Sequence, residues 1–268
     1  MKGHAQNRPH ETAQRVTMTL VALAALLLAW ESAVRSFAIP DWTLPAPSLI
    51  AQTLVSDWTI LGPAFLSTLR VTMTSLMLAI GGGVTLGILV SRSRILDATL
   101  SPIAVVMQVT PLVAIAPLLI LYIGAHATLY VAAFLVAFFP MLAGTLSGLR
   151  TIDPALQDLF TLYDASPSQR LWRLEFPSAL PFIMAGLRTA GGLALVGAVV
   201  AEFVSGAIGD QAGLAYRIVE ASYRLNMPRL FAALLLIALT GIMIYAFTGL
   251  VSRLVLSRWS SPRAPMPD

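Results

Sequence analysis

Apolar residues fill six long stretches of this 268-residue chain, and most polar residues lie in the segments between them. The stretches are 16–34, 68–91, 101–123, 126–148, 181–204 and 230–252. Each is close to the ~20 residues that a helix needs to cross ~30 Å of hydrocarbon. The pattern therefore predicts an all-α, polytopic integral membrane protein, a helical bundle of about six transmembrane helices in a lipid bilayer.

Composition supports a membrane location and removes several kinds of chemistry. Hydrophobic residues make up 57% of the chain and charged residues 11%, whereas a soluble domain carries about 25% charged residues. The absence of cysteine excludes disulfides, thiolate metal ligands and cysteine nucleophiles. The net charge of +4 comes from basic residues near the ends of the stretches, which is typical of membrane topology and does not indicate nucleic-acid binding. No stretch is left for a soluble domain, so we expect any catalytic or substrate-capturing domain to come from another chain.

Basic residues indicate the orientation of the chain. With the N-terminus inside, the inner segments contain Lys2, Arg8, Arg15, Arg92, Arg94, Arg150, Arg170, Arg173, Arg188, Arg253, Arg258 and Arg263. The outer segments contain Arg35, Arg70, Arg217, Arg224 and Arg229. Because cytoplasmic segments carry the excess of Lys and Arg, both termini are expected in the cytoplasm. The expected domains are an inner tail (1–15), a single membrane domain (16–258) and a second inner tail (259–268).

The first apolar stretch has two interpretations. Basic residues precede it, as in a cleaved signal peptide. It continues into Trp30-Glu31 without a clear small-residue cleavage site, so we expect a retained membrane anchor.

A charged inner segment, 150–177, lies between the fourth and fifth stretches and contains two helix starts. Asp153-Pro154 places a capping acid before a proline in the first helical turn. Ser166-Pro167-Ser168-Gln169 has the spacing of a capping box. The segment is predicted to form two short helices that break near Asp164-Ala165 and end before Pro177.

The two larger outer segments have different predicted roles. In segment 35–67, an amphipathic part at 48–61 is expected to lie along the outer membrane surface. Segment 205–229, which includes Gly209 and Asp210, is a candidate lid or docking surface.

Polar residues inside the apolar stretches mark a candidate translocation path. Intramembrane polar groups usually face the bundle interior or water, although Ser and Thr often bond to their own helix backbone. The candidates are Thr72, Ser75, Gln108, Thr110 and Glu202. Glycines at 81–83 and prolines at 102, 111 and 117 predict close helix contacts and broken helix geometry.

The chain resembles the permease subunits of ATP-binding-cassette importers, in the six-span type that serves nitrate, taurine, alkanesulfonates and pyrimidine-type precursors. The inner loop of that family has the pattern Glu-Ala-Ala, three residues, Gly, nine residues, Ile, one residue and Leu-Pro. The spacing is kept here by Asp158-Leu159-Phe160, Asp164, Leu174 and Phe176-Pro177. Asp164 stands where the family has Gly, and Asp can adopt the same left-handed turn at some cost. Further similarity lies in Ala179-Leu180-Pro181, Gly186-Leu187-Arg188 and Ala201-Glu202-Phe203.

This resemblance implies one half of a dimeric pore in the bacterial cytoplasmic (inner) membrane, with a second copy of the chain as the expected other half. A cytoplasmic ABC ATPase dimer and an extracytoplasmic solute-binding protein are the implied partners. The ATPase would bind ATP and Mg²⁺, so this chain is expected to hold no cofactor, no metal and no catalytic site. Segment 150–177 would transmit ATPase motion to the spans. The implied coupling residues are Asp158, Leu159, Phe160, Asp164, Ala165, Ser166, Arg170, Leu171, Trp172, Arg173 and Pro177.

The solute and two other function classes are left open by the sequence. A pyrimidine- or thiamine-precursor-like solute is slightly favoured over a sulfonate, taurine or nitrate. A secondary transporter would need charged coupling sites near the bilayer midplane, whereas the acids here lie near the ends of stretches or between them. A structural membrane subunit is the other alternative. A membrane metalloprotease is disfavoured because the only histidines are His4, His10 and His126, and no His-Glu-x-x-His motif occurs.

Overall fold

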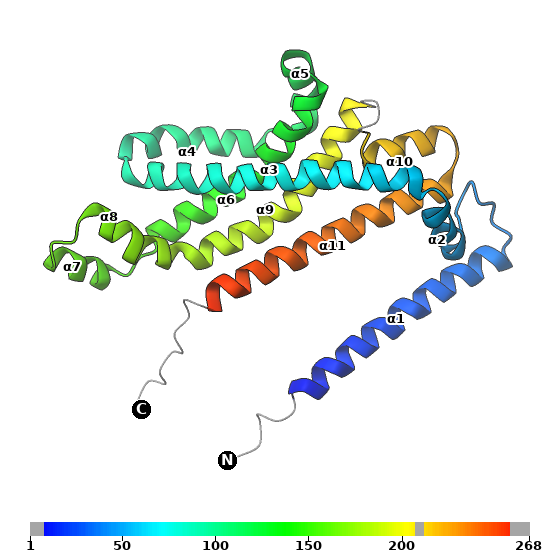
Figure 1. Ribbon diagram of the computed structural model, residues 1–268, viewed down its shortest axis with the longest axis horizontal. Helices are drawn as coiled ribbons and strands as arrows, with labels where there is room; N and C mark the ends of the chain where they lie inside the picture. The colour runs from blue at the N-terminus through cyan, green and yellow to red at the C-terminus, as the bar shows by residue number, and fades with distance from the viewer. Residues whose placement is uncertain (1–7, 207–211, 258–268) are drawn as a thin grey trace. The chain divides into compact units, whose positions relative to one another are not determined.

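Every regular element in the computed structural model, which describes residues 8–206 and 212–257, is a helix (Figure 1). The long helices are α1 (Arg8–Ser36), α3 (Trp58–Arg92), α6 (Ala125–Arg150), α9 (Phe176–Ser205) and α11 (Met227–Ser257). The shorter elements are α2 (Pro47–Ser56), α4 (Arg94–Val109), α5 (Leu112–Ile123), α7 (Pro154–Leu162), α8 (Pro167–Arg170), the π-helical turn η1 (Leu171–Glu175) and α10 (Leu214–Tyr223). Within the described ranges, five helices are long and apolar enough to cross a membrane, and α4 with α5 makes a sixth span if the bent pair is one span. The predicted all-α membrane architecture is confirmed.

The described residues group into two compact units. One contains the residues up to Leu61 together with Arg217–Leu234. The other contains Gly62–Tyr216 and the residues from Leu235 onward. The second unit therefore holds α4 to α9 and most of α3.

Small residues form the core of the second unit, where α3, α6 and α9 pack together (Figure 1). A Cβ added to Gly148 of α6 would lie 2.8 Å from Ala179 of α9, and one added to Gly83 of α3 would lie 2.6 Å from the Cβ of Met141. Such close backbone approach is typical of membrane helices, which gain contact area where side chains are small. The close contacts predicted from glycines 81–83 are found at Gly83, whereas Gly81 has nothing within 4 Å.

The third predicted span is two helices instead of one. α4 and α5 meet at an angle of 101°. Thr110 lies between them with ψ of 126°, an extended conformation that a following proline favours. The break therefore falls at Pro111, whereas Pro102 and Pro117 lie inside their helices.

Segment 35–67, which is predicted to lie outside, is also more helical than predicted. It contains α2, and α3 begins at Trp58, ten residues before the predicted start of the second span. The reason is a helical repeat of buried positions that starts early in α3: Leu61, Ala64, Thr68 and Val71 are all 2% exposed or less. The end of the predicted amphipathic part, 57–61, thus belongs to the α2–α3 junction and to α3.

The predicted end of the second short helix before Pro177 is wrong. α8 continues through η1 into α9, so that one helix runs from Pro167 to Ser205. In η1 the N–H of Phe176 donates to Leu171, five residues earlier. This wider turn accommodates Pro177, which lacks the N–H that a regular α-helix needs at that position.

Segment 205–229, which is predicted to lie outside, is not simply a polar loop, since it contains the ten-residue helix α10. Gly209 and Asp210 lie outside the described residues. Likewise, residues 1–7 of the predicted inner tail 1–15 and the whole tail 259–268 lie outside them, and α1 begins at Arg8 within the first tail.

Candidate functional site

The 150–177 loop has both predicted helix caps. The Asp153 carboxylate accepts a hydrogen bond of 2.9 Å from the backbone N–H of Ala155. Ser166 accepts from the N–H of Gln169, and the Gln169 side chain accepts from the N–H of Ser166, which completes the capping box. These caps satisfy N–H groups that the first turn of a helix leaves without partners.

The turn between α7 and α8 is left-handed at Asp164, whose φ is +48°. Ala165 N–H donates to Phe160 O and Asp164 N–H donates to Thr161 O, both at 3.0 Å. This pair of bonds is a Schellman motif, which usually carries Gly at the left-handed position. The prediction that Asp164 adopts the conformation of the family's Gly therefore agrees with the backbone.

Most of the implied coupling residues lie at the surface of the loop. Trp172 is 61% exposed and packs against the ring of Phe176, with 5.5 Å between ring centroids. Leu174 is 6% exposed and joins the packed interior. Arg170 donates to the hydroxyl of Thr161 and so ties α8 to α7. The loop is a braced structure with an exposed aromatic side chain.

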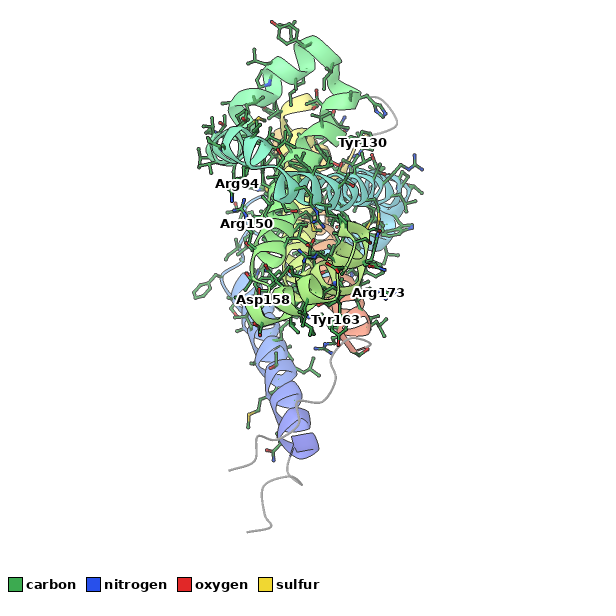
Figure 2. The ribbon with its side chains drawn as sticks, turned by 90° about the vertical axis from the view of Figure 1, so that its left-hand side faces the viewer. Arg94, Tyr130, Arg150, Asp158, Tyr163 and Arg173 are labelled. Carbon is green, nitrogen blue, oxygen red and sulfur yellow. The ribbon has the colours of Figure 1, made fainter. Side chains whose placement is uncertain are left out.

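A shallow hollow lies on this loop, between the end of α7 and the start of the long α8–α9 helix. Its lining residues come from both sides of the turn: Leu159, Phe160, Tyr163, Ala165, Gln169 and Arg173. Figure 2 looks onto this loop, and Asp158, Tyr163 and Arg173 lie on the side that faces the viewer. Four of the implied coupling residues, Leu159, Phe160, Ala165 and Arg173, thus meet at one surface feature.

Two ion pairs support the base of the loop and were not predicted from the sequence. Arg92, at the end of α3, pairs with Glu175 of η1. Arg150, at the end of α6, pairs with Asp97 of α4 at 2.6 Å. Opposite charges near the ends of different helices were the only sequence signal, and that signal does not say which residues pair. The pairs connect α3, α4 and α6 to the loop region.

Three of the five candidate path residues lie inside the packing of the second unit. Thr72 donates to the backbone O of Thr68 at 2.8 Å, which is a bond within α3. Ser75 donates to the backbone O of Tyr130 at 2.9 Å and so links α3 to α6. Both side chains are fully buried, and Glu202 is 3% exposed.

Glu202 belongs to a closed network at the start of α10. Its carboxylate accepts from the Thr68 hydroxyl at 2.7 Å and from the N–H of Ala215 at 3.0 Å. The Thr68 hydroxyl in turn accepts from the N–H of Leu214 at 2.9 Å. A Cβ on Gly213 would overlap the Glu202 carboxylate. Glu202 thus caps α10 from the end of α9, where a carboxylate is favoured by the positive end of the helix dipole.

Gln108 and Thr110, the other two candidates, lie together at the bend between α4 and α5. Both line a hollow between this bent pair and the α6–α9 pair. Other lining residues, which the sequence did not predict, include Phe139, Pro140 and Leu193. The Thr110 hydroxyl donates to the backbone O of Val106 at 2.7 Å.

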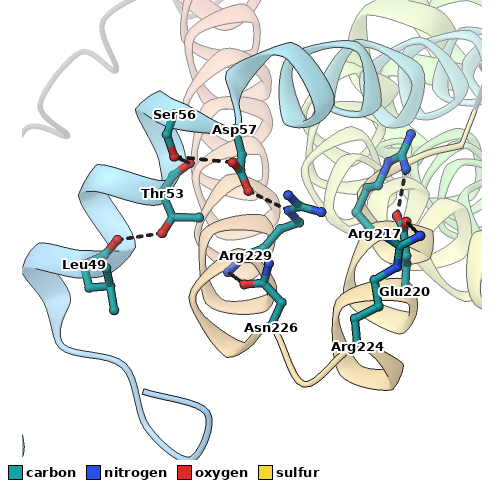
Figure 3. Close-up of polar contacts among 9 residues, drawn as sticks. All are labelled: Leu49, Thr53, Ser56, Asp57, Arg217, Glu220, Arg224, Asn226 and Arg229. Atoms are coloured by element: carbon teal, nitrogen blue, oxygen red, sulfur yellow. Dashed lines mark hydrogen bonds and ion pairs between the residues drawn. The ribbon is translucent and has the colours of Figure 1, made fainter. Parts of the chain in front are cut away.

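In the first unit, one ion pair joins the start of α11 to the α2–α3 junction, and two others form within and just after α10 (Figure 3). Arg229 donates to Asp57 at 2.6 Å. Glu220 pairs with both Arg217 and Arg224. The hydrogen bond from Arg217 holds the pKa of Glu220 below its usual value, so this carboxylate stays ionised in mildly acidic solution.

Comparison with known proteins places this arrangement in a class. The candidate spans and the capped loop that leads into one of them have the fold of an ABC-transporter permease. The fold resembles that of the MetNI methionine ABC transporter in an inward-facing conformation, with a TM-score of 0.63, 18% identity and coverage of 73% of this chain and 96% of that one.

The sequence profile of the binding-protein-dependent transport system inner membrane components matches residues 79–259. The chain belongs to this family. The riboflavin transport system permease RibX of Chloroflexus aurantiacus is 35% identical over 246 residues, which are 90% of this chain and 89% of RibX. The formylaminopyrimidine transport permease ThiX of Halalkalibacterium halodurans is 30% identical over 223 residues, which are 82% of this chain and 87% of ThiX.

Proposed function

We propose that the chain forms one half of the solute path of an ATP-driven importer and that its 150–177 loop carries ATPase motion into the spans. The observation that carries the proposal is the continuous helix from Pro167 to Ser205. Because the docking surface and a membrane span share one helix, a partner that displaces the loop would also displace the span. Family membership, with its binding-protein-dependent importers, supports this role.

The proposed partners follow from that role. A cytoplasmic ABC ATPase dimer would grip the loop and bind ATP and Mg²⁺, so the chain itself would be neither an enzyme nor a cofactor-binding protein. A second copy of the chain would complete the path, and a solute-binding protein would deliver the solute from outside. We also propose a single membrane domain over 16–258 with both termini in the cytoplasm, since basic residues are in excess on that side.

A small organic ring compound is the proposed solute class. RibX and ThiX carry names that refer to riboflavin and formylaminopyrimidine, and each aligns with more than four fifths of this chain. Sulfonates, taurine and nitrate, the other solutes that the family resemblance implies, carry charge that the hollow around Gln108 does not complement.

Trp172→Ala tests the coupling role. An exposed aromatic side chain at a partner surface is a typical hot spot, so we expect ATP-dependent uptake to fall about tenfold or more while the complex still inserts and hydrolyses ATP. The measurement is uptake and ATPase activity of the assembled complex in proteoliposomes. Arg170→Glu should act in the same direction because it removes the bond to Thr161.

Ile95→Ala is the matched control, since Ile95 is 79% exposed at the start of α4 and lies outside the loop. It should leave the uptake-to-hydrolysis ratio unchanged. Wild-type uptake by Trp172→Ala, with normal ATPase co-purification, would contradict the proposed coupling surface. ATP-independent uptake driven by an ion gradient would instead support a secondary transporter.

A further inference from the structure

Gln108 is a polar side chain near the end of the otherwise apolar second half of α4. It is exposed, and among residues 8–206 and 212–257 it has no hydrogen-bond partner. An amide both donates and accepts hydrogen bonds. At membrane depth an unpaired amide is costly, so such groups face water, a ligand or another helix.

Two hollows flank this amide, and both belong to the second unit. The first lies between the α4–α5 bend and the α6–α9 pair, and the second lies between α3, α4 and α6. Only Gln108 and Phe139 line both hollows. An amide and an aromatic ring therefore stand together where the two spaces adjoin.

The first hollow has no charged side chain in its lining. Arg150 lines the second hollow and is already paired with Asp97 at 2.6 Å. Arg188 precedes Leu193 by five positions on α9, so at 100° per residue it projects about 140° away from the lining residue. An anion in the first hollow would therefore lose its hydration without gaining a counter-charge.

We propose that Gln108 contacts the transported solute and that the hollow takes a neutral, flat heteroaromatic compound, which the amide hydrogen-bonds at its edge and Phe139 packs against. This inference rests on the proposed importer function. The Thr110 hydroxyl, which donates to its own helix, offers a remaining acceptor at the bend.

Because this chain contains no cysteine, Gln108→Cys introduces one reporter thiol per copy of the chain. We expect Cys at this position to react with a membrane-impermeant methanethiosulfonate reagent at least about tenfold faster than Val106→Cys does. Val106 is the control because it is 62% exposed on the same helix and lines neither hollow. Reaction with lipid-soluble maleimide alone, or spontaneous disulfide formation between two copies, would overturn the assignment, since Gln108 would then face lipid or the second copy.

Uptake of radiolabelled riboflavin, formylaminopyrimidine and taurine tests the solute class separately. For the wild-type complex we expect uptake of at least one ring compound and no uptake of taurine. Gln108→Leu should lower the uptake of the ring compound three- to tenfold, which is about the effect of losing one hydrogen bond. Gln108→Asn should partly restore this uptake. Taurine uptake, uptake of neither ring compound, or an unaffected Gln108→Leu variant would overturn the proposal. Failure of the importer function itself is distinguishable, because the wild-type chain would then neither co-purify with an ATPase nor support any ATP-dependent uptake.

Discussion

Glutamates near the C-terminal ends of two long helices perform the same local task. Glu31, near the end of α1, accepts from the backbone N–H of Ser48 at 3.0 Å and from its hydroxyl at 2.7 Å, in the first turn of α2. Glu202, near the end of α9, accepts from the N–H of Ala215 in the first turn of α10. In both places a carboxylate satisfies N–H groups that the start of a helix leaves without partners. These two acidic residues at the ends of predicted spans thus hold the first turns of the short helices α2 and α10.

Gly213→Ala tests the capping of α10 by Glu202. The added Cβ would overlap the carboxylate, so we expect a loss of about 1–3 kcal/mol of stability, as in other overpacked interiors. Thermal unfolding of the purified protein, followed by tryptophan fluorescence, measures the effect. Gly192→Ala is the control, because a Cβ there meets nothing within 4 Å. Equal unfolding temperatures for both variants would show that the network does not contribute to stability.

At the scale of the helices, small residues set how closely the elements pack. Gly144 and Gly148 are one turn apart on α6, and a Cβ on either would lie 2.8 Å from atoms of α9. Gly191 packs against Thr248 and Ile244 of α11, whereas its neighbour Gly192 has no close contact within the described chain. Of the two glycines, Gly191 therefore serves packing within the chain.

Gly148→Ala is expected to separate α6 from α9. Its Cβ would meet the backbone of Ala179, which cannot move without shifting the helix, so a destabilisation of about 1–3 kcal/mol is expected. The same fluorescence measurement should leave Gly81→Ala at or above the wild-type unfolding temperature, since Gly81 has open space and Ala is the better helix former. If Gly148→Ala is as stable as Gly81→Ala, α6 and α9 do not pack so closely at Gly148 that a methyl group is excluded.

For the whole molecule, the proposed mechanism depends on which side of the membrane the 150–177 loop faces. Ser168→Cys places a thiol on the exposed part of this loop, in a chain without other cysteines. A membrane-impermeant maleimide should label it only after the cells are lysed. Tyr223→Cys, at an 86% exposed position in the segment predicted to be outside, should be labelled in intact cells. Labelling of Cys at position 168 in intact cells would show that the loop faces the exterior. That result would contradict the proposed topology and the ATPase-coupling role.

Interactions between residues that are close in the chain could be predicted from the sequence. The caps at Asp153 and Ser166 and the left-handed turn at Asp164 are formed by residues at most a few positions apart. Apolar stretches of membrane-spanning length likewise predicted all-helical spans, because a backbone in lipid must satisfy its hydrogen bonds within each helix. For the solute path, the sequence selected polar residues in the spans but could not tell Gln108, at the hollow, from Thr72 and Ser75, inside the packing.

By itself the sequence determined the all-helical membrane architecture and the caps and turn of the 150–177 loop, since hydropathy and capping act over one helix or one turn. Only the tertiary structure decided which proline bends a span, which acidic residues cap a helix and which form ion pairs. Pro111 breaks the third span whereas Pro140 and Pro181 remain inside helices, and Glu202 meets Thr68 from 134 positions away. These outcomes depend on neighbours brought together by packing, because a freed backbone group or a buried carboxylate is stable only where another helix supplies its partner.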